Sequence, residues 1–530
     1  MDSSPNIFAS LDDFVPPGGG SQVVGRNMAN NFFFRALMRY GSFDAYHFFL
    51  SNRAHRNLFM EKHAPFLNDP EIAPKIRLFD RVDLPDALRK YDYTVIHQSD
   101  HVTHLAALAR LRNTLGARVP LSAFIHSLSY PAYMPRYLEM HFSGFCEADT
   151  IVCSSECGKK VVAQCLENTT AAGYPRSKVT LKVVPLGIDE PPGVMDRQLA
   201  RKQLGFKNNQ VVGLCFGRFS DFDKMDLFPL LQALKKVPGR DYRMVLAGAV
   251  HDQEYFRILQ LWVKAMGLLD RVEFVVEPPN QKKLALFAGA DFFVSIADNP
   301  QETFGLTVLE ALHAGTPVIV SDYDGYRELA GDKAGIRVTT RWMPVERLIQ
   351  LESIMDMRTL HRYLAQSLQV DMNELTQALR LMYTDAGARQ NFAEHARERF
   401  ANEFNHARII ATLEDHWRTQ KRMFTEIPKE LIPLQMDIFK TFAHYVTETP
   451  DGETKVMATD FARQLLAANV DYPLLPSMSE VIDSRIVKEL VRHCFKPCVV
   501  GDIYSAFGDG WRTVFIVMWA LKHDLLEVTA

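Results

Sequence analysis

The sequence predicts an α/β protein in which two domains, each with a parallel sheet covered by helices, precede a mainly helical unit. Short, nearly continuous apolar runs alternate with helical patterns, as expected of strands that are buried on both faces. The alternation starts afresh at Val211, after a stretch rich in proline and glycine at residues 184–193. A stretch of this composition favours a linker between two domains.

The apolar runs that we expect to form strands fall into two sets. The first set is 93–97, 121–126, 150–154 and 179–186. The second set is 211–217, 243–248, 272–276, 291–296 and 317–322. Strands that alternate with helices are typical of α/β architecture. We therefore expect one domain over residues 1–190 and a second over residues 191–426.

The pattern becomes helical after Leu329. Apolar residues recur at helical spacing in 371–381, 386–400 and 407–424. A separate, mainly helical unit is expected over residues 427–530, with helices at 484–494 and 510–521. Its role is unknown, and contact with a protein partner or oligomerisation is the interpretation that we favour.

Composition excludes several classes of protein. The 530 residues carry 60 Lys and Arg against 63 Asp and Glu, a formal charge of −3, and 47% of them are hydrophobic. The chain is too apolar for a disordered protein, and its charge gives no global reason to bind nucleic acid. In the tail, Lys488, Arg492 and Arg512 alone do not supply a basic recognition face. The seven cysteines are too few for a disulfide scaffold, so a reducing compartment and buried thiols are expected.

The sequence contains neither a secretory signal nor a run of about 18 apolar residues that would span a membrane. A cytoplasmic protein is therefore expected. The run 31–50 places five phenylalanines beside Arg35 and Arg39. Such aromatic residues are more often core, and peripheral contact with the inner face of a membrane is left open as the alternative.

The most informative segment is residues 298–322, DNPQETFGLTVLEALHAGTPVIVSD. It predicts a strand end, a loop, a helix that begins near residues 304–306 and ends near Gly315, and a further strand. Free N–H groups at a helix start suit a phosphate, and Gly305 would let a ligand approach the backbone. Glu302 before the helix and Glu310 within it are placed to accept hydrogen bonds from sugar hydroxyls. A solvated helix face is the alternative interpretation.

A second segment, FGRFSDFDK at residues 216–224, follows directly after a predicted strand. Arg218 and Lys224 would project from the loop at the carboxyl end of that strand, where open α/β sheets bind ligands. Two cations at this place can neutralise a diphosphate and stabilise the charge that develops as it leaves. Surface salt bridges are the alternative interpretation.

Taken together, these motifs resemble the retaining glycosyltransferases of family 4, also described as glycosyl transferases group 1. The likeness covers roughly residues 5–420. It also takes in the glycine-rich stretch 16–22, Ile125-His126-Ser127, the linker VPLGID at 184–189 and the closing helices at 371–417. The resemblance implies a GT-B fold, in which two Rossmann-like domains face a cleft, and a last helix that crosses back to the first domain.

The resemblance also implies roles for individual residues in binding the donor. Arg218 and Lys224 would bind the diphosphate of a nucleotide-sugar donor, and Glu302 would contact the donor sugar. Glu310 would contact the ribose of the nucleotide. The backbone N–H groups that would assist the two cations belong to Phe304, Gly305 and Leu306.

Three further residues would complete the site on the side of the first domain. His126 would lie beside the sugar at the reacting face, and Gly19 and Gly20 would leave room for the diphosphate or the acceptor. The catalytic set implied is therefore His126, Arg218, Lys224 and Glu302. Neither a metal nor a cofactor is expected, because the cations and the helix dipole would do that work.

The motifs of this chain differ from the family pattern at two positions. The residue after Lys224 is Met225 where the family usually has glycine, and the linker reads Pro-Leu-Gly where Pro-Asn-Gly is commoner. An insertion between Leu329 and about Gln369 also interrupts the run into the closing helices. We interpret it as a lid or a contact surface.

The expected function is transfer of a sugar from a nucleotide-diphosphate donor to a hydroxyl of a glycan, a lipid-linked or a small-molecule acceptor, as in polysaccharide biosynthesis. Two alternatives belong to other classes. One is a nucleotide-sugar epimerase or a phosphorylase with the same fold. The other is a non-catalytic scaffold that binds sugar nucleotides, against which the intact pairs of cations and carboxylates argue.

Overall fold

A computed structural model describes residues 5–15, 25–188, 195–239, 241–429, 434, 436–475, 478, 481–508 and 510–529. The chain divides into two compact units. The larger unit consists of Met1–Phe49, Phe59–Arg77 and Leu84–Ile432, and it contains most of the first large sheet and the whole of the second. The smaller unit consists of Leu50–Leu58, Leu78–Asp83 and Pro433–Ala530.

The first sheet has seven strands in the order β3-β2-β1-β4-β5-β6-β7. Their bounds are β1 (Ile7–Ser10), β2 (Ala45–Leu50), β3 (Ile76–Asp80), β4 (Val95–Gln98), β5 (Leu121–Phe124), β6 (Thr150–Cys153) and β7 (Thr180–Val183). The pairs from β2 through β7 are parallel, with Phe8 of β1 opposite both Tyr46 and Val95. The order reverses between β1 and β4, which makes this edge a topological switch point.

The aromatic run at residues 31–50 belongs to the core of the first sheet. It forms the end of helix α1 (Gly25–Tyr40) and strand β2. The rings of Phe33, Phe34, Phe48 and Phe49 are buried, and Phe34 packs against Phe48 with ring centroids 5.6 Å apart. Burial of these rings explains the run without a membrane surface.

The second sheet repeats the first in its strand order, β10-β9-β8-β11-β12-β13. Its strands are β8 (Val211–Phe216), β9 (Tyr242–Gly248), β10 (Val272–Val276), β11 (Phe292–Ser295), β12 (Val318–Ser321) and β13 (Gly335–Val338), and all neighbouring pairs are parallel. The connecting helices include α9 (Phe228–Lys236), α10 (Gln253–Ala265), α11 (Asn280–Gly289), α12 (Leu306–His313) and α13 (Tyr326–Ala330). The switch point lies between β8 and β11.

The insertion expected from Leu329 to about Gln369 is smaller than the sequence indicated. Strand β13 lies within that range and is an integral, parallel strand of the second sheet, paired with β12. The excursion proper therefore begins with β14 (Thr340–Trp342) and ends with β15 (Leu368–Val370), which form an antiparallel pair. Between them lie α14 (Glu346–Leu351) and α15 (Met357–Gln366). The short β13 was missed because its sequence, GIRV, contains only two large apolar residues.

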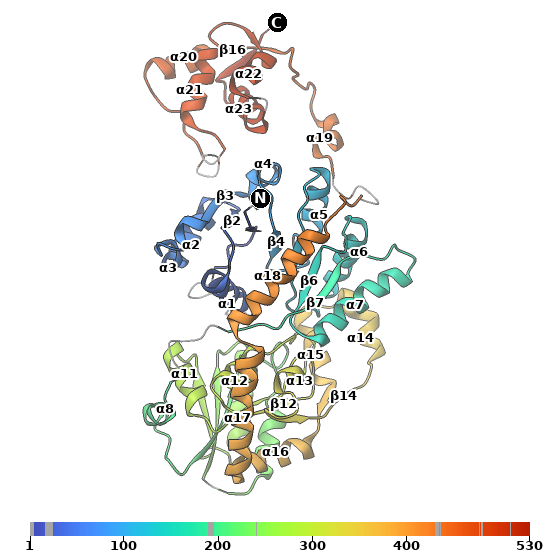
Figure 1. The fold of residues 1–530 in the computed structure, drawn as a ribbon, viewed down its shortest axis with the longest axis vertical. Helices are drawn as coiled ribbons and strands as arrows, with labels where there is room; N and C mark the ends of the chain where they lie inside the picture. Colours follow the sequence, from blue (N-terminus) through green and yellow to red (C-terminus); the bar gives the residue numbers. More distant parts are fainter. Residues whose placement is uncertain are drawn as a thin grey trace. The chain divides into compact units, whose positions relative to one another are not determined.

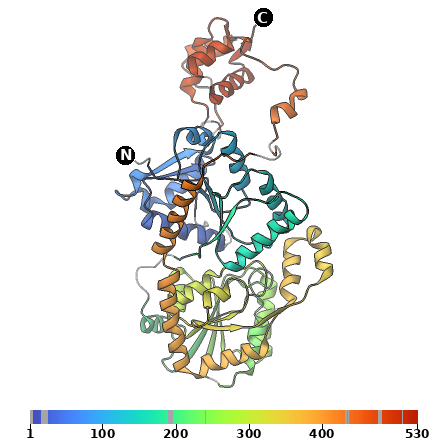
Figure 2. The same cartoon turned by 45° about the vertical axis from the view of Figure 1, so that its right-hand side comes forward.

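Three helices close the larger unit, namely α16 (Met372–Thr384), α17 (Ala386–Glu403) and α18 (His406–Met423). Helix α18 returns to the first sheet, as Figures 1 and 2 both show. Its Trp417 is 1% exposed, packs against Phe8 and donates a hydrogen bond from Nε1 to Ser122 Oγ at 3.0 Å. The carboxylate of Glu414 accepts a hydrogen bond from the backbone N–H of Ser42 at 2.7 Å. Helix α18, the last helix of the second domain, thus packs against the first domain.

The smaller unit has a core of its own, built around Val456, Ile503 and Val517. It contains helices α20 (Asp460–Ala467), α21 (Ser484–His493), α22 (Val500–Phe507) and α23 (Trp511–Lys522). A three-stranded antiparallel sheet joins them, in the order β17 (Cys498–Val499), β16 (Lys455–Ala458) and β18 (Leu526–Val528). The sequence predicted α21 and α23, but neither α20 and α22 nor the sheet.

Among the described helices, none is long and apolar enough to cross a bilayer. Over the same residues, His, Cys, Asp and Glu side chains nowhere gather in groups of three that would hold a metal ion.

The burial of Trp417 generates a testable prediction about the closing helix. Trp417→Ala should lower the free energy of unfolding by about 3–5 kcal/mol, because it removes a large buried side chain and leaves a cavity. Urea unfolding followed by circular dichroism measures the loss. Trp262→Ala, at a side chain that is 41% exposed, is the matched control and should lose about 1 kcal/mol or less. Equal losses in the two variants would contradict the packing described here.

Candidate functional site

The candidate site lies at the carboxyl ends of three neighbouring strands of the second sheet. The loop 217–227 follows β8, the loop 296–305 follows β11 and leads into α12, and the loop 322–325 follows β12. Because β8 and β11 flank the switch point, the loops after them diverge to opposite faces and leave room for a ligand. The predicted cations and carboxylates come from the first two loops and from α12.

Lys224 and Glu302 form the centre of this arrangement. Lys224 Nζ lies 2.8 Å from Glu302 Oε2 and 3.1 Å from the hydroxyl of Tyr326, and the two charged side chains are 11% and 18% exposed. Burial alone would lower the pKa of Lys224, but the Glu302 carboxylate more than offsets it, so the pKa lies above its usual value. Burial would likewise raise the pKa of Glu302, and Lys224 holds it below the usual range. Both groups are therefore charged at neutral pH.

Arg218 is held apart from that pair by its own loop. Its guanidinium donates a hydrogen bond to the carbonyl of Asp223 at 3.1 Å and lies 3.6 Å from the Asp223 carboxylate. About a fifth of the side chain is exposed. The loop thus presents two cations, one paired with a carboxylate across the site and one tied to its own backbone.

Gly305 is required by two constraints at the start of α12. Its φ of +106° lies in the left-handed region that L side chains rarely adopt. A Cβ at this position would also stand 2.3 Å from the ring of Tyr326. Among the described residues no side chain caps the helix, which begins at Leu306, and N–H groups at such a helix start suit an anion. The expected loop-to-helix turn at Phe304, Gly305 and Leu306 is therefore present.

Glu310 is paired on one side only. Lys283 Nζ of α11 lies 2.5 Å from Glu310 Oε1. The other oxygen, Oε2, is buried and finds no hydrogen-bond partner among the described residues. A buried acceptor without a partner costs free energy that a ligand hydroxyl can recover.

His126 stands at the carboxyl side of β5 in the first sheet. Its Nε2 lies 3.1 Å from Asn30 Oδ1. Burial, and then the charge of Arg26, lower the pKa of His126 to about 4, so the imidazole is neutral at physiological pH. Among the described residues, no hydrogen bond or ion pair joins His126 to Lys224 or Glu302. One contact between the two sides is the Gln301 amide, which donates to the Tyr130 hydroxyl at 3.2 Å. Gly19 and Gly20 lie outside the described residues.

Several residues of the site were not predicted from the sequence. Tyr326 bonds Lys224, and the Asn299 amide donates to the Lys224 carbonyl at 2.8 Å. Lys283 neutralises Glu310. Asn299 follows the predicted strand β11, and Lys283 follows the predicted strand β10. Both are polar residues after a predicted strand, which is the pattern that identified Arg218 as a candidate. Tyr326 carried none, because an aromatic residue at a helix start is ordinarily core.

Asp324 is the most unusual of the residues that the sequence reasoning missed. It adopts a positive φ of 48°, and burial, followed by the charge of Glu302, raises its pKa to about 8. Its Oδ2 is buried and has no hydrogen-bond partner among the described residues. A protonated carboxyl beside an ionised Glu302 can donate a hydrogen bond in the site.

The fold and part of the sequence are similar to those of known proteins. The family model described as "Glycosyl transferases group 1" matches residues 196–367, the part that carries Lys224, Glu302 and Glu310. The D-inositol 3-phosphate glycosyltransferase of Nocardia farcinica is 28% identical over 169 residues, which are 30% of this chain and 36% of that protein. The alpha-monoglucosyldiacylglycerol synthase of Streptococcus pneumoniae is 28% identical over 195 residues, 35% of this chain and 40% of that protein. The chain thus spans little more than a third of the length of these curated relatives.

Solved structures resemble the chain over a longer stretch. Anabaena HepE in complex with UDP and glucose superimposes with a TM-score of 0.52 at 18% identity, covering 78% of this chain and all of that one. A glycosyltransferase from Rickettsia africae gives a TM-score of 0.54 at 13% identity, covering 79% and 98%. The architecture is the GT-B fold, as predicted, and at these identities the likeness concerns the fold alone.

The raised pKa of Asp324 predicts a pH-dependent stability. Between about pH 4 and pH 8 the folded state holds a proton that the unfolded state has lost, so stability falls as the pH rises through this window. Asp324→Asn, which keeps the shape and tolerates the positive φ, should remove a slope of at most about 1.4 kcal/mol per pH unit. Urea unfolding at several pH values measures it. Asp332→Asn, at an exposed carboxylate, controls for the loss of one charge. Parallel pH dependence in the wild type and Asp324→Asn would show that this carboxyl is not protonated.

Proposed function

We propose that this chain, whose residues 196–367 match the family model of the glycosyl transferases group 1, is a retaining glycosyltransferase. It would take a sugar from a nucleotide-diphosphate donor and place it on a hydroxyl of a glycan, a lipid-linked or a small-molecule acceptor. The donor would bind mainly to the second domain, and the acceptor to the first.

The observation that carries the proposal is the charged pair of Lys224 and Glu302 beside the uncapped start of α12. A lysine and open backbone N–H groups suit a diphosphate. The carboxylate of Glu302, beside the lysine, suits the hydroxyls of the sugar that is attached to the diphosphate. Glu310 Oε2, further along the same helix, has no hydrogen-bond partner in the part of the chain that the structure describes, and it is placed for a ribose hydroxyl.

The chemistry requires one bond to break and one to form at the anomeric carbon. The bond from this carbon to the diphosphate oxygen breaks, and the electron pair leaves with the diphosphate. Lys224, which stays protonated because its pKa is raised, and Arg218 stabilise the negative charge that develops there. The acceptor oxygen forms the new bond on the same face, and its proton passes to the departing diphosphate. Retention of configuration follows from this front-face route.

The chain's own residues would mainly position the reactants. The Lys224–Glu302 ion pair holds both groups in place before the donor arrives, so little reorganisation is needed during the reaction. His126, neutral at physiological pH, would offer a hydrogen bond to the sugar rather than a charge. No metal or cofactor is required by this scheme, and the nucleotide sugar is a substrate.

Substitution of the central pair tests the proposal. A thermal-shift screen of UDP-, GDP-, ADP- and CMP-linked sugars identifies the donor, because a ligand that binds the folded state raises the unfolding temperature. With that donor, Lys224→Ala and Glu302→Gln should each lower the rate of sugar transfer by about 100-fold or more. Lys235→Ala, at an exposed lysine on α9, is the matched control and should leave the rate unchanged.

Other outcomes of these assays would contradict the proposal. If the rates of sugar transfer and of donor hydrolysis are unchanged in both variants, Lys224 and Glu302 do not belong to the active site. Isomerisation of a nucleotide sugar supplied alone would indicate an epimerase, and release of a sugar phosphate from glycan and phosphate would indicate a phosphorylase. Binding without any turnover would indicate a scaffold.

A further inference from the structure

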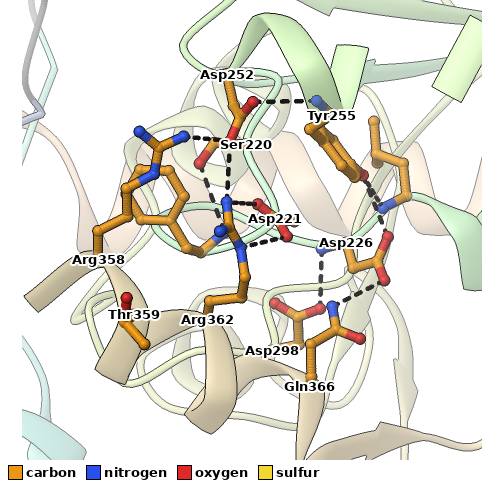
Figure 3. A network of polar contacts seen from close by, with 12 residues as sticks. Ser220, Asp221, Asp226, Asp252, Tyr255, Asp298, Arg358, Thr359, Arg362 and Gln366 are labelled. Carbon is orange, nitrogen blue, oxygen red and sulfur yellow. Dashed lines mark hydrogen bonds and ion pairs between the residues drawn. The ribbon is translucent and has the colours of Figure 1, made fainter. Parts of the chain in front are cut away.

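Helix α15 of the excursion lies against the loop that carries Arg218 and Lys224 (Figure 3). Arg362 reaches Asp221 of that loop with two hydrogen bonds, Nε to Oδ2 at 2.9 Å and NH2 to Oδ1 at 3.1 Å. This is the paired geometry in which a guanidinium and a carboxylate fix each other's orientation. The Asp221 side chain is 16% exposed, so the pair is partly shielded from water.

The same arginine ties the loop to the next strand of the sheet. Arg362 NH2 also donates to Asp252 Oδ2 at 3.0 Å, and Asp252 caps α10 after β9 by accepting from the N–H of Tyr255. Arg358, one turn earlier on α15, donates to the same oxygen of Asp252 at 2.5 Å. Both guanidinium groups lie over the ring of Phe222, at 5.6 and 4.9 Å from its centroid. Helix α15 therefore contacts the loop at Asp221 and Phe222, which form its tip.

A second set of contacts holds the far end of the loop. The Gln366 amide of α15 donates to Asp226 Oδ2 at 3.1 Å, while Asp226 Oδ1 accepts from the hydroxyl of Tyr255 at 3.2 Å. The N–H of Asp226 donates to Asp298 Oδ2 at 2.9 Å, next to Asn299, which binds the Lys224 carbonyl. The loop is thus held between Arg218 and Lys224, at Asp221, and again just after Lys224, at Asp226, and α15 supplies a contact at each of these two places.

We propose that α15 is a positioning element of the donor site, in which Arg362 acts through Asp221 to hold the Arg218–Lys224 loop in the conformation that binds a diphosphate. The inference rests on the proposed function. It assigns to the excursion at residues 340–370 the role of a fixed clamp on the loop rather than a lid. Without it the loop would sample other conformations, and binding would be weakened by the fraction of time spent in them.

Five variants separate this role from general stability. Arg362→Gln removes the paired contact, and Arg362→Lys keeps the charge but loses the fork. Arg341→Gln is the matched control, because Arg341 belongs to the same excursion and pairs with Asp371 at 2.7 Å but does not touch the loop. Asp221→Asn, alone and combined with Arg362→Gln, completes a double-mutant cycle.

Hydrogen–deuterium exchange of peptides within residues 217–227 measures the loop directly in the full chain. Exchange should rise in Arg362→Gln, rise less in Arg362→Lys and stay at the wild-type level in Arg341→Gln. Calorimetry with UDP and GDP as probes should show affinity for whichever nucleotide binds reduced roughly 2- to 30-fold in Arg362→Gln. The double variant should bind no more weakly than Arg362→Gln alone, because that substitution already removes the contact with Asp221 that Asp221→Asn weakens.

The outcomes distinguish failure of this inference from failure of the proposed function. If wild-type exchange and nucleotide affinity persist in Arg362→Gln, the positioning role is wrong while the donor site stands. If the wild type binds neither UDP nor GDP and transfers no sugar, the proposed function is wrong, and the exchange data still decide whether α15 holds the loop. Equal changes in Arg362→Gln and Arg341→Gln would overturn the inference, since they would reflect a general loosening of the excursion.

Discussion

A lysine taken out of water stays charged only if an opposite charge is held beside it, and this constraint organises the candidate site. Lys224 and Glu302 come from loops after different strands, yet their charged atoms lie 2.8 Å apart. Breaking a buried pair by removing one partner leaves an uncompensated charge, so each residue depends on the position of the other. The glycines follow from the same constraint. A Cβ on Gly217 would stand 3.0 Å from Lys224 Cε, and one on Gly305 would meet Tyr326, which bonds Lys224.

The sequence predicted the parts of the fold that are encoded locally. Strands such as β8 and β12 are continuous apolar runs with clear ends, and they appear within one or two residues of the expected bounds. Lys224 lies in the loop after β8, and Glu302 lies in the loop after β11. Because the carboxyl ends of parallel strands lie at the same edge of a sheet, the approach of Lys224 to Glu302 was predictable. Strand β2 was hidden in an aromatic run, and β13 was too short and too weakly apolar to be distinguished from the excursion that follows.

What could not be predicted depends on contacts between distant residues. Arg362 and Asp221 are 141 residues apart, and nothing in a helix with ordinary charges indicates which loop it will contact. The protonation of Asp324 arises from burial and from Glu302 together, and neither is visible in the local sequence. The presence of two similar α/β domains, by contrast, was expected from the same alternation of strands and helices in both halves and from the resemblance to a family, and the two sheets do share one strand order.

The central claim is that a nucleoside diphosphate binds where Lys224, Glu302 and the start of α12 meet. A crystal structure of the chain with the nucleotide that stabilises it most strongly tests this directly. We expect a diphosphate oxygen within hydrogen-bonding distance of Lys224 Nζ, backbone N–H groups of residues 304–306 on the same diphosphate, and a ribose hydroxyl on Glu310 Oε2. A nucleotide bound elsewhere, with the Lys224–Glu302 pair untouched by any ligand atom, would contradict it.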